Sequence, residues 1–172
     1  MSVSISRRGV VCCRAFLDVP LSAGIVWGQL RDFQRFARQD PFHATINVEG
    51  DLPRAGAHLS LAHRYAGLSI PRTGRIVVWR EEVGYSFSDL SMRGPRHGFP
   101  HTFSYRLEPR ENACRLKIEV RGLWTSRWIP HWLARLWLWW VFGQVVRHVE
   151  QELNLYQLWR KRRALVASTK PT

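Results

Sequence analysis

The segment from Trp128 to Lys161 constrains the fold of this chain more than any other. It contains six of the nine tryptophans, and between Pro130 and Lys161 only Gly143 disfavours a helix. Pro130 suits the first turn of a helix, where the N–H that it lacks would have no partner. A helix of about 32 residues is about 48 Å long at about 1.5 Å per residue, which is longer than a small domain is wide.

The two halves of this helix differ in their hydrophobic pattern. After Gly143, apolar residues recur at spacings of three and four, which places them on one face: Val145, Val149, Leu153 and Tyr156. This half is typical of a helix that packs on a sheet. Before Gly143, apolar side chains surround the helix axis, so something must cover Trp132 to Trp140. The candidates are the protein's own core, a second copy in a homodimer, a membrane surface and a bulky apolar ligand.

The net charge of +13 over 172 residues indicates an anionic partner. The candidates are nucleic acid, acidic lipid headgroups, a carboxylate or phosphate ligand, and an acidic carrier protein. The arginines are scattered without a block of five or more like charges, which favours a general surface bias over a dedicated nucleic-acid site. Tryptophans packed in a helix are also poor platforms for stacking bases, so nucleic acid is the disfavoured partner.

The cysteine and hydropathy patterns favour a cytoplasmic protein. The cysteines Cys12, Cys13 and Cys114 are odd in number, which argues against a disulfide framework and suits a reducing compartment. The first nine residues contain no apolar core of signal-peptide length. Polar and charged residues interrupt the apolar run from Ile129 to Val146. This argues against a transmembrane span but permits peripheral association with a membrane.

Changes in hydrophobic period divide the chain into elements. We expect a flexible N-terminus at 1–10, a single α+β domain at 11–160 and a basic disordered tail at 161–172. A first strand at 11–19 precedes two short helices, one ending near Phe33 and one at 34–39. Six further segments have a period of two and are predicted strands: 44–49, 57–65, 73–79, 85–91, 101–108 and 114–123. The short links favour one mostly antiparallel sheet, covered by the last helix on its concave side.

The opening of the domain resembles that of the START-like, or SRPBCC, superfamily. The resemblance is carried by these segments: Phe16–Ser22, Val26–Trp27, Asp32–Phe33 with Phe36, Gly56–Leu59, Gly74–Trp79, Tyr85–Phe87 and Thr102–Val120. It spans residues 11 to 160 and implies a helix-grip fold, in which a curved seven-stranded sheet wraps the terminal helix around an apolar cavity. Members include lipid carriers, hormone-binding and allergen-type proteins, coenzyme Q-binding proteins and polyketide aromatase/cyclases.

Strand alternation predicts which side chains face such a cavity. The odd residues of 101–107 share one face, and the same alternation places Tyr85, Phe87 and Asp89 together. Five polar side chains therefore fall on apolar faces: His63, Tyr65, Asp89, His101 and Tyr105. The alternative for each is a wet strand end or a backbone partner. Because a His/Asp pair in a dry pocket suits acid–base chemistry, the predicted catalytic residues are His101, Asp89 and Tyr105.

The predicted ligand-binding residues come from the inner faces and from basic loops. The inner-face candidates are His63, Tyr65, Tyr85, Phe87, Phe103, Trp124, Val141 and Val145. Arg72, Arg93 and Arg96 could receive a carboxylate or phosphate of the ligand, because a guanidinium group binds such groups with two hydrogen bonds. Solvated loop arginines are the alternative. No metal site and no cofactor is predicted, because the His and Cys spacings do not suit zinc and no nucleotide-binding glycine loop is present.

These features lead to two functional hypotheses. The favoured one is a protein that binds or transports a hydrophobic small molecule, such as a lipid, a polyene or a polyketide-like compound, between sheet and helix. The alternative is an aromatase/cyclase or dehydratase-type enzyme that uses His101, Asp89 and a tyrosine for general acid–base chemistry. Such an enzyme would dock an acidic carrier protein on its basic surface. The choice between carrier and enzyme stays open, because a fold does not decide a function.

Overall fold

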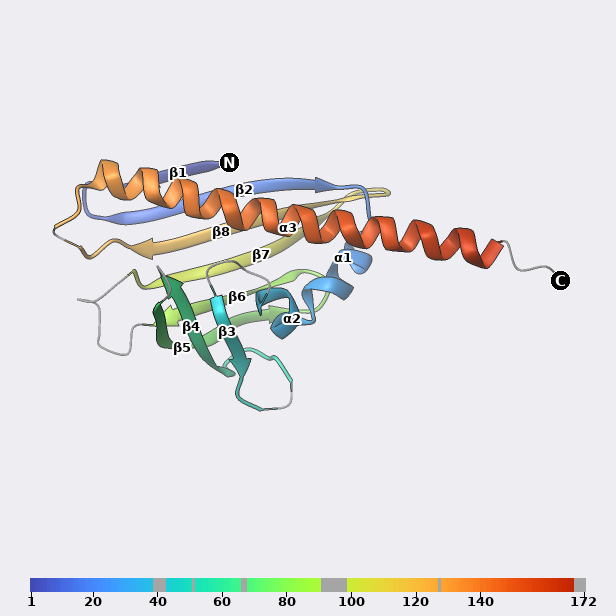
Figure 1. The fold of residues 1–172 in the computed structure, drawn as a ribbon, viewed down its shortest axis with the longest axis horizontal. Helices are drawn as coiled ribbons and strands as arrows, with labels where there is room; N and C mark the ends of the chain where they lie inside the picture. The colour runs from blue at the N-terminus through green and yellow to red at the C-terminus, as the bar shows by residue number, and fades with distance from the viewer. Residues whose placement is uncertain (39–42, 51, 66–67, 91–98, 127, 169–172) are drawn as a thin grey trace.

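The computed structural model describes residues 1–38, 43–50, 52–65, 68–90, 99–126 and 128–168. This part of the chain forms an α+β fold in which a curved antiparallel sheet holds a long C-terminal helix (Figure 1). The strands are β1 Ser2–Ile5, β2 Val10–Val19, β3 His43–Val48, β4 His58–Tyr65, β5 Leu68–Arg80, β6 Gly84–Leu90, β7 His101–Pro109 and β8 Cys114–Leu123. The helices are α1 Ala23–Leu30, α2 Phe33–Arg38 and α3 His131–Ser168. The sheet order is β1-β2-β8-β7-β6-β5-β4-β3, and the predicted helix-grip architecture is confirmed.

The sheet has one strand more than the seven predicted, and the addition comes from residues expected to be flexible. Ser2–Ile5 pairs antiparallel with β2, and Val3 is buried. The turn between β1 and β2 depends on Gly9, whose φ of +79° favours glycine. A Cβ at this position would meet the carbonyl oxygen of Trp124 at 2.7 Å. The N-terminus is therefore part of the sheet.

Helix α3 packs across the concave side of the sheet with one stripe of side chains. The buried residues of this stripe are Ala134, Leu138, Phe142, Val145, Val149 and Leu153. Their spacings of three and four place them on one helix face, as expected for a helix lying on a sheet. The helix continues to Ser168, beyond the predicted end at Lys161, and extends past the sheet at its C-terminal end (Figure 1).

The protein's own core covers only one side of the first half of α3. Trp132, Leu136, Trp139 and Trp140 are each more than half exposed. Leu138 and the other buried members of the stripe lie on the opposite side. The domain core, one of the candidates predicted to cover this segment, therefore buries only part of the surface of the first half of α3.

The carboxylate of Glu81, in the turn after β5, holds helix α1 against the sheet. The side chain of Glu81 accepts hydrogen bonds from Nε1 of Trp79 at 2.9 Å and from Nε1 of Trp27 at 2.7 Å. The hydrogen bond from Trp79 lowers the pKa of Glu81 most, and the hydrogen bond from Trp27 lowers it further. The two indole rings also meet edge to face, with ring centroids 5.3 Å apart. Ser22 occupies the N-cap position of α1, but its side chain makes no capping hydrogen bond.

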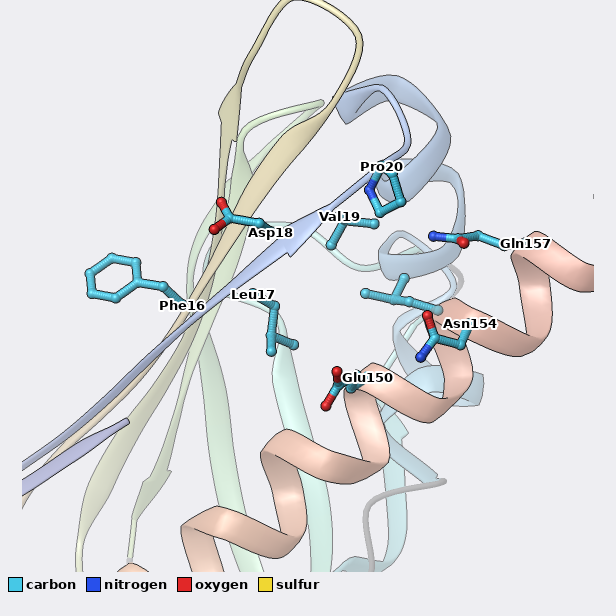
Figure 2. Close-up of a pocket in the computed structure, with 9 residues that line it drawn as sticks. Phe16, Leu17, Asp18, Val19, Pro20, Glu150, Asn154 and Gln157 are labelled. Atoms are coloured by element: carbon cyan, nitrogen blue, oxygen red, sulfur yellow. The ribbon is translucent and has the colours of Figure 1, made fainter.

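A small groove separates the end of β2 from the middle of α3 (Figure 2). Its volume is about 140 Å³, and it is lined by Phe16, Leu17, Asp18, Val19, Pro20, Glu150, Leu153, Asn154 and Gln157. In Figure 2 the ring of Phe16 points away from α3, toward the outer side of the sheet. The polar residues from α3 make this groove a poor site for an apolar ligand.

The outer face of the sheet carries a cluster of ion pairs around one carboxylate. Glu119 accepts hydrogen bonds from Arg14 at 2.9 Å, from Lys117 at 2.8 Å and from Arg121. Burial would raise the pKa of Glu119, but the hydrogen bonds from Lys117, Arg14 and Arg121 outweigh burial and lower this pKa to about 2. The cluster therefore joins β2 to β8 while Glu119 is ionised.

Two glycine substitutions should have opposite effects on stability. Gly84 has a φ of +137°, and a Cβ there would overlap the carbonyl oxygen of Tyr105. We expect Gly84→Ala to lower the free energy of unfolding by about 3 kcal/mol. Gly28 lies inside α1 with no atom within 4 Å of an added Cβ, so Gly28→Ala should raise it by about 0.5 to 1 kcal/mol. Urea denaturation measures the free energy of unfolding of both variants. An equal change in the two variants would contradict the close approach of β6 and β7 at Gly84.

The Glu119 cluster predicts a specific dependence of stability on pH. Because the pKa of Glu119 is lower in the folded state than its unfolded value of about 4.3, its stabilisation is present above about pH 5 and is lost as the pH falls toward 2. We expect Glu119→Gln to cost about 1 to 2 kcal/mol at neutral pH, after allowance for solvent screening, and almost nothing near pH 2. Urea denaturation across this pH range tests the prediction. Glu111→Gln, at an exposed turn residue, is the matched control and should have little effect at any pH.

Candidate ligand-binding site

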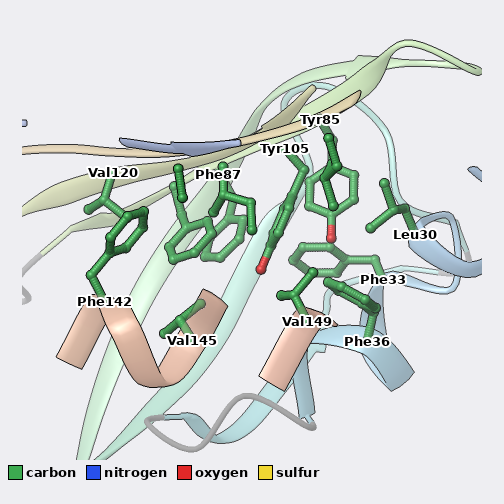
Figure 3. Packing of buried hydrophobic residues seen from close by; sticks show 14 of the residues in the cluster. Leu30, Phe33, Phe36, Tyr85, Phe87, Tyr105, Val120, Phe142, Val145 and Val149 are labelled. Atoms are coloured by element: carbon green, nitrogen blue, oxygen red, sulfur yellow. The ribbon is translucent and has the colours of Figure 1, made fainter. Parts of the chain in front are cut away.

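Aromatic side chains form the centre of the concave face (Figure 3). Phe87 of β6 stacks on Phe103 of β7 with ring centroids 5.7 Å apart and an angle of 9° between the rings. The ring of Tyr105 contacts that of Phe103 at 5.0 Å. All three side chains are buried. The period of two in these strands predicted this inner face correctly, because alternate residues of a strand point to the same side.

Two tyrosines lie at the end of this face that helices α1 and α2 cover. Tyr85 and Tyr105 are paired across β6 and β7, with ring centroids 5.3 Å apart. Phe33 packs edge-on against Tyr85 at 5.2 Å, and Phe36 packs edge-on against Tyr105 at 5.4 Å. Both tyrosine hydroxyl groups point away from the sheet toward the helices (Figure 3).

Asp89 and His101 form a polar pair at the other end. They are also paired across β6 and β7, with 3.9 Å between Nδ1 of His101 and Oδ2 of Asp89. Asp89 is 1% exposed. Nδ1 of His101 lies 2.8 Å from the carbonyl oxygen of Phe99. A proton on Nδ1 donates to that carbonyl, which leaves Nε2 as the nitrogen that can accept a proton.

Arg72 joins this pair through the register of β4, β5 and β6. It is paired with Leu61 on β4, while Gly74, two residues further along β5, is paired with Asp89. Paired residues share a face, and so do residues two apart. Arg72 is therefore a diagonal neighbour of Asp89 on the concave side, at about 7 to 8 Å. Its Nε is shielded from solvent and has no hydrogen-bond partner among the described residues.

The predicted catalytic residues do not form one group. Tyr105 and His101 lie on the same face of β7, but four residues apart, which is about 13 Å along a strand. Phe103 and its partner Phe87 lie between them. The sequence predicted all three on an inner face. They do lie on one face, but the distance along β7 separates Tyr105 from the His101–Asp89 pair. The concave face thus has a polar group at each end and an aromatic centre.

Helix α3 lies opposite the aromatic centre of the concave face. Val145 and Val149 are buried and face the aromatic centre (Figure 3), while Val141 is half-buried. Phe142, which packs beside Val120 (Figure 3), is not among the predicted ligand-binding residues. The position of Phe142, three residues before Val145 and seven before Val149, was the available signal. His148 is also not among them; its Nε2 is shielded from solvent and has no hydrogen-bond partner in the part of the chain that is described.

A row of rings connects the His101 end to the first half of α3. The ring of Phe99 stacks on His101 at 4.9 Å, Trp124 lies 6.1 Å from Phe99, and Trp137 of α3 lies 6.0 Å from Trp124. Trp124, a predicted ligand-binding residue, is half-buried. Its Nε1 is shielded from solvent without a hydrogen-bond partner among residues 1–38, 43–50, 52–65, 68–90, 99–126 and 128–168.

All the ligand-binding residues remain predictions, and for four of them the structure describes no side chain. The backbones of His63 and Tyr65 belong to β4, but their side chains lie outside what the structure describes. Arg93 and Arg96, predicted at the rim, also lie outside the described residues.

Metal-ligating groups and buried thiols were the other candidates for chemistry among the described residues. The described residues contain no cluster of three His, Cys, Asp or Glu side chains suited to a metal ion. Burial, with a smaller contribution from Cys12, raises the pKa of Cys13 to about 12, and burial also raises that of Cys114. Protonated thiols are weak nucleophiles. None of the described helices is long and apolar enough to span a bilayer.

Comparisons with known proteins identify the fold. No protein-family model matches the chain, and no curated protein matches its sequence. A START superfamily protein from Mycobacterium smegmatis is similar in structure, with a TM-score of 0.64 and 12% identity over 84% of this chain and 98% of that chain. Ara h 8.0201 has a TM-score of 0.61 and 13% identity, over 84% of this chain and 98% of that chain. The di-domain aromatase/cyclase StfQ of the steffimycin biosynthetic pathway has a TM-score of 0.71 and 13% identity, over 90% of this chain and 53% of that chain.

Identities this low describe a shared fold. The likeness spans most of the present chain in each case and agrees with the sheet order and the long terminal helix. It also agrees with the resemblance that residues 11–160 carry in the sequence. This chain therefore has the helix-grip fold of the START-like, or SRPBCC, superfamily.

Proposed function

We propose that this protein binds a hydrophobic small molecule between the concave face of the sheet and α3. The observation that carries the proposal is the composition of that face. Its centre is aromatic, at Phe87 and Phe103, and each end carries polar groups. Apolar walls with a few placed polar groups are the usual composition of a small-molecule site. A planar or polyene ligand would lie against the stacked rings, with Val145 and Val149 on its other side.

The polar end favours a ligand with an anionic or carbonyl head. The guanidinium of Arg72 lies on the same face as His101 and Asp89, and its Nε lacks a hydrogen-bond partner among the described residues. A shielded N–H without a hydrogen-bond partner is unfavourable, and a ligand carboxylate would accept a hydrogen bond from it. Tyr85 and Tyr105 would serve the opposite end of the ligand as hydroxyl groups that can donate to an oxygen.

The geometry of Asp89 and His101 favours a second candidate function, a cyclase or dehydratase. In this proposal Nε2 of His101 removes a proton from a carbon between two carbonyl groups, and the carboxylate of Asp89 stabilises the resulting imidazolium. The enolate then attacks a second carbonyl carbon, forming a carbon–carbon bond. The alkoxide so formed takes the proton back from His101, and loss of water gives the unsaturated product. The aromatase/cyclase StfQ shares the fold, which makes this candidate the natural alternative.

Enlarging one buried residue should test where the ligand binds. Val145 is buried between helix and sheet, so Val145→Phe should weaken binding of cis-parinaric acid, a fluorescent polyene, by at least about tenfold, because the added ring occupies the ligand's space. Val77→Phe adds the same volume at an exposed position of β5 and should leave the affinity unchanged. Fluorescence titration measures both variants, and thermal denaturation shows that each is folded. Unchanged affinity in folded Val145→Phe would place the ligand elsewhere.

Two conservative substitutions should separate binding from catalysis. If the protein is a cyclase, His101→Gln and Asp89→Asn should each reduce turnover of a linear poly-β-ketone by about 10² to 10⁴, while affinity for the polyene changes by less than about threefold. Product formation is measured by mass spectrometry beside the fluorescence titration. A protein that binds the polyene but cyclises no such substrate, with or without these substitutions, would refute the enzyme proposal and leave the binding proposal standing.

A further inference from the structure

The most unusual surface of the molecule lies on the first half of α3. We define the tryptophan face by its exposed residues: Trp128, Trp132, Leu133, Leu136, Trp139 and Trp140. Trp128 is 95% exposed and Trp132 is 66% exposed. Single exposed apolar residues are common on protein surfaces, but a contiguous group of large ones marks an interaction site.

Helix geometry shows that this face is continuous and points away from the sheet. At about 100° per residue, the five helical members fall within an arc of about 120°. The buried stripe that contains Leu138 and Phe142 lies on the opposite side. Beyond Gly143 the same exposed face becomes polar, with Arg147, Glu150, Gln151 and Asn154. The apolar character is therefore confined to one end of the helix.

The surroundings of the tryptophan face are cationic. No aspartate or glutamate occurs between Arg121 and Val149, nor between Met1 and Leu17. These two segments lie together, because the N–H of Trp124 donates to the carbonyl oxygen of Gly9 at 2.8 Å. Arg7 and Arg8, in the turn before Gly9, are exposed, as is Arg135. An exposed apolar face thus lies among arginines without a nearby carboxylate from either segment.

We propose that the tryptophan face is a docking surface for an anionic membrane. Indole rings favour the boundary between headgroups and acyl chains, and arginines beside them are attracted to acidic headgroups. A helix with an apolar face and a basic border lies in the plane of the interface. The surface is therefore complementary to anionic lipid in both polarity and charge.

A second copy of the chain fits this surface less well. A twofold contact through the tryptophan face would bring together two chains of net charge +13, each with Arg135 beside the face. Like charges at such a contact are unfavourable. This inference does not rest on the proposed small-molecule ligand, since it is drawn from the outer side of α3 only.

Vesicle co-sedimentation tests the apolar part of the proposal. The full chain should bind vesicles that contain phosphatidylglycerol, bind neutral phosphatidylcholine vesicles weakly, and dissociate as salt is raised. Trp132→Gln with Trp139→Gln should weaken binding to the anionic vesicles by more than about tenfold. Both positions are exposed, so folding should be unaffected, which circular dichroism checks. Phe16→Ala, at a half-exposed aromatic residue on the outer side of the sheet, is the matched control and should bind like the unmodified chain.

Removing single charges tests the electrostatic part. Arg135→Gln should weaken binding to the anionic vesicles by about fivefold, which corresponds to about 1 kcal/mol for an arginine near the surface. Arg110→Gln removes the same charge at the β7–β8 turn and should change binding by less than about twofold. Absence of binding to anionic vesicles overturns the proposal. Sedimentation equilibrium that detects a dimer abolished by Trp132→Gln with Trp139→Gln, without vesicle binding, would assign the face to a second copy.

Discussion

The contact between one stripe of α3 and the concave sheet is the interaction on which the rest of the structure depends. Phe142, Val145 and Val149 cover aromatic residues that would otherwise face water. Burial of each such side chain stabilises the fold by about 1.5 to 3 kcal/mol. Because Phe87 and Phe103 belong both to this interface and to the candidate site, the surface that holds the domain together is also the surface on which a ligand would bind.

Two carboxylates show how differently the fold treats charge on the two faces of the sheet. On the outer face, Glu119 accepts hydrogen bonds from three cationic side chains, which lower its pKa to about 2 in spite of burial. On the inner face, Asp89 is buried, with Nδ1 of His101 3.9 Å from its Oδ2. An outer-face cluster of this kind joins strands. A polar pair inside an apolar layer costs free energy unless its groups are paired.

Helix α3 presents different surfaces to different surroundings. Its inner stripe completes the candidate ligand-binding site, and the outer side of its first half forms the tryptophan face. The row of rings from His101 to Trp137 reaches this half of the helix. The polar end of the concave face and the proposed membrane-docking surface therefore lie at the same end of the domain.

The sequence by itself determined the elements and their inner faces. The period of two placed Phe103 and Tyr105 inward, and the stripe through Val145 and Val149 placed α3 on the sheet, because alternation and helical spacing are local properties of a chain. The sequence did not predict strand β1. Four residues before a turn carry too little periodicity, and the stabilisation of β1 comes from its pairing with β2.

Only the tertiary structure decided which residues meet. Strand period fixes the face of a side chain but not its register, so the pairing of Asp89 with His101 depended on how β6 and β7 align. The exposure of Trp132 and Trp139 was likewise undecided, because a helix that is apolar on all sides does not indicate which side faces the core. The position of the sheet made that choice.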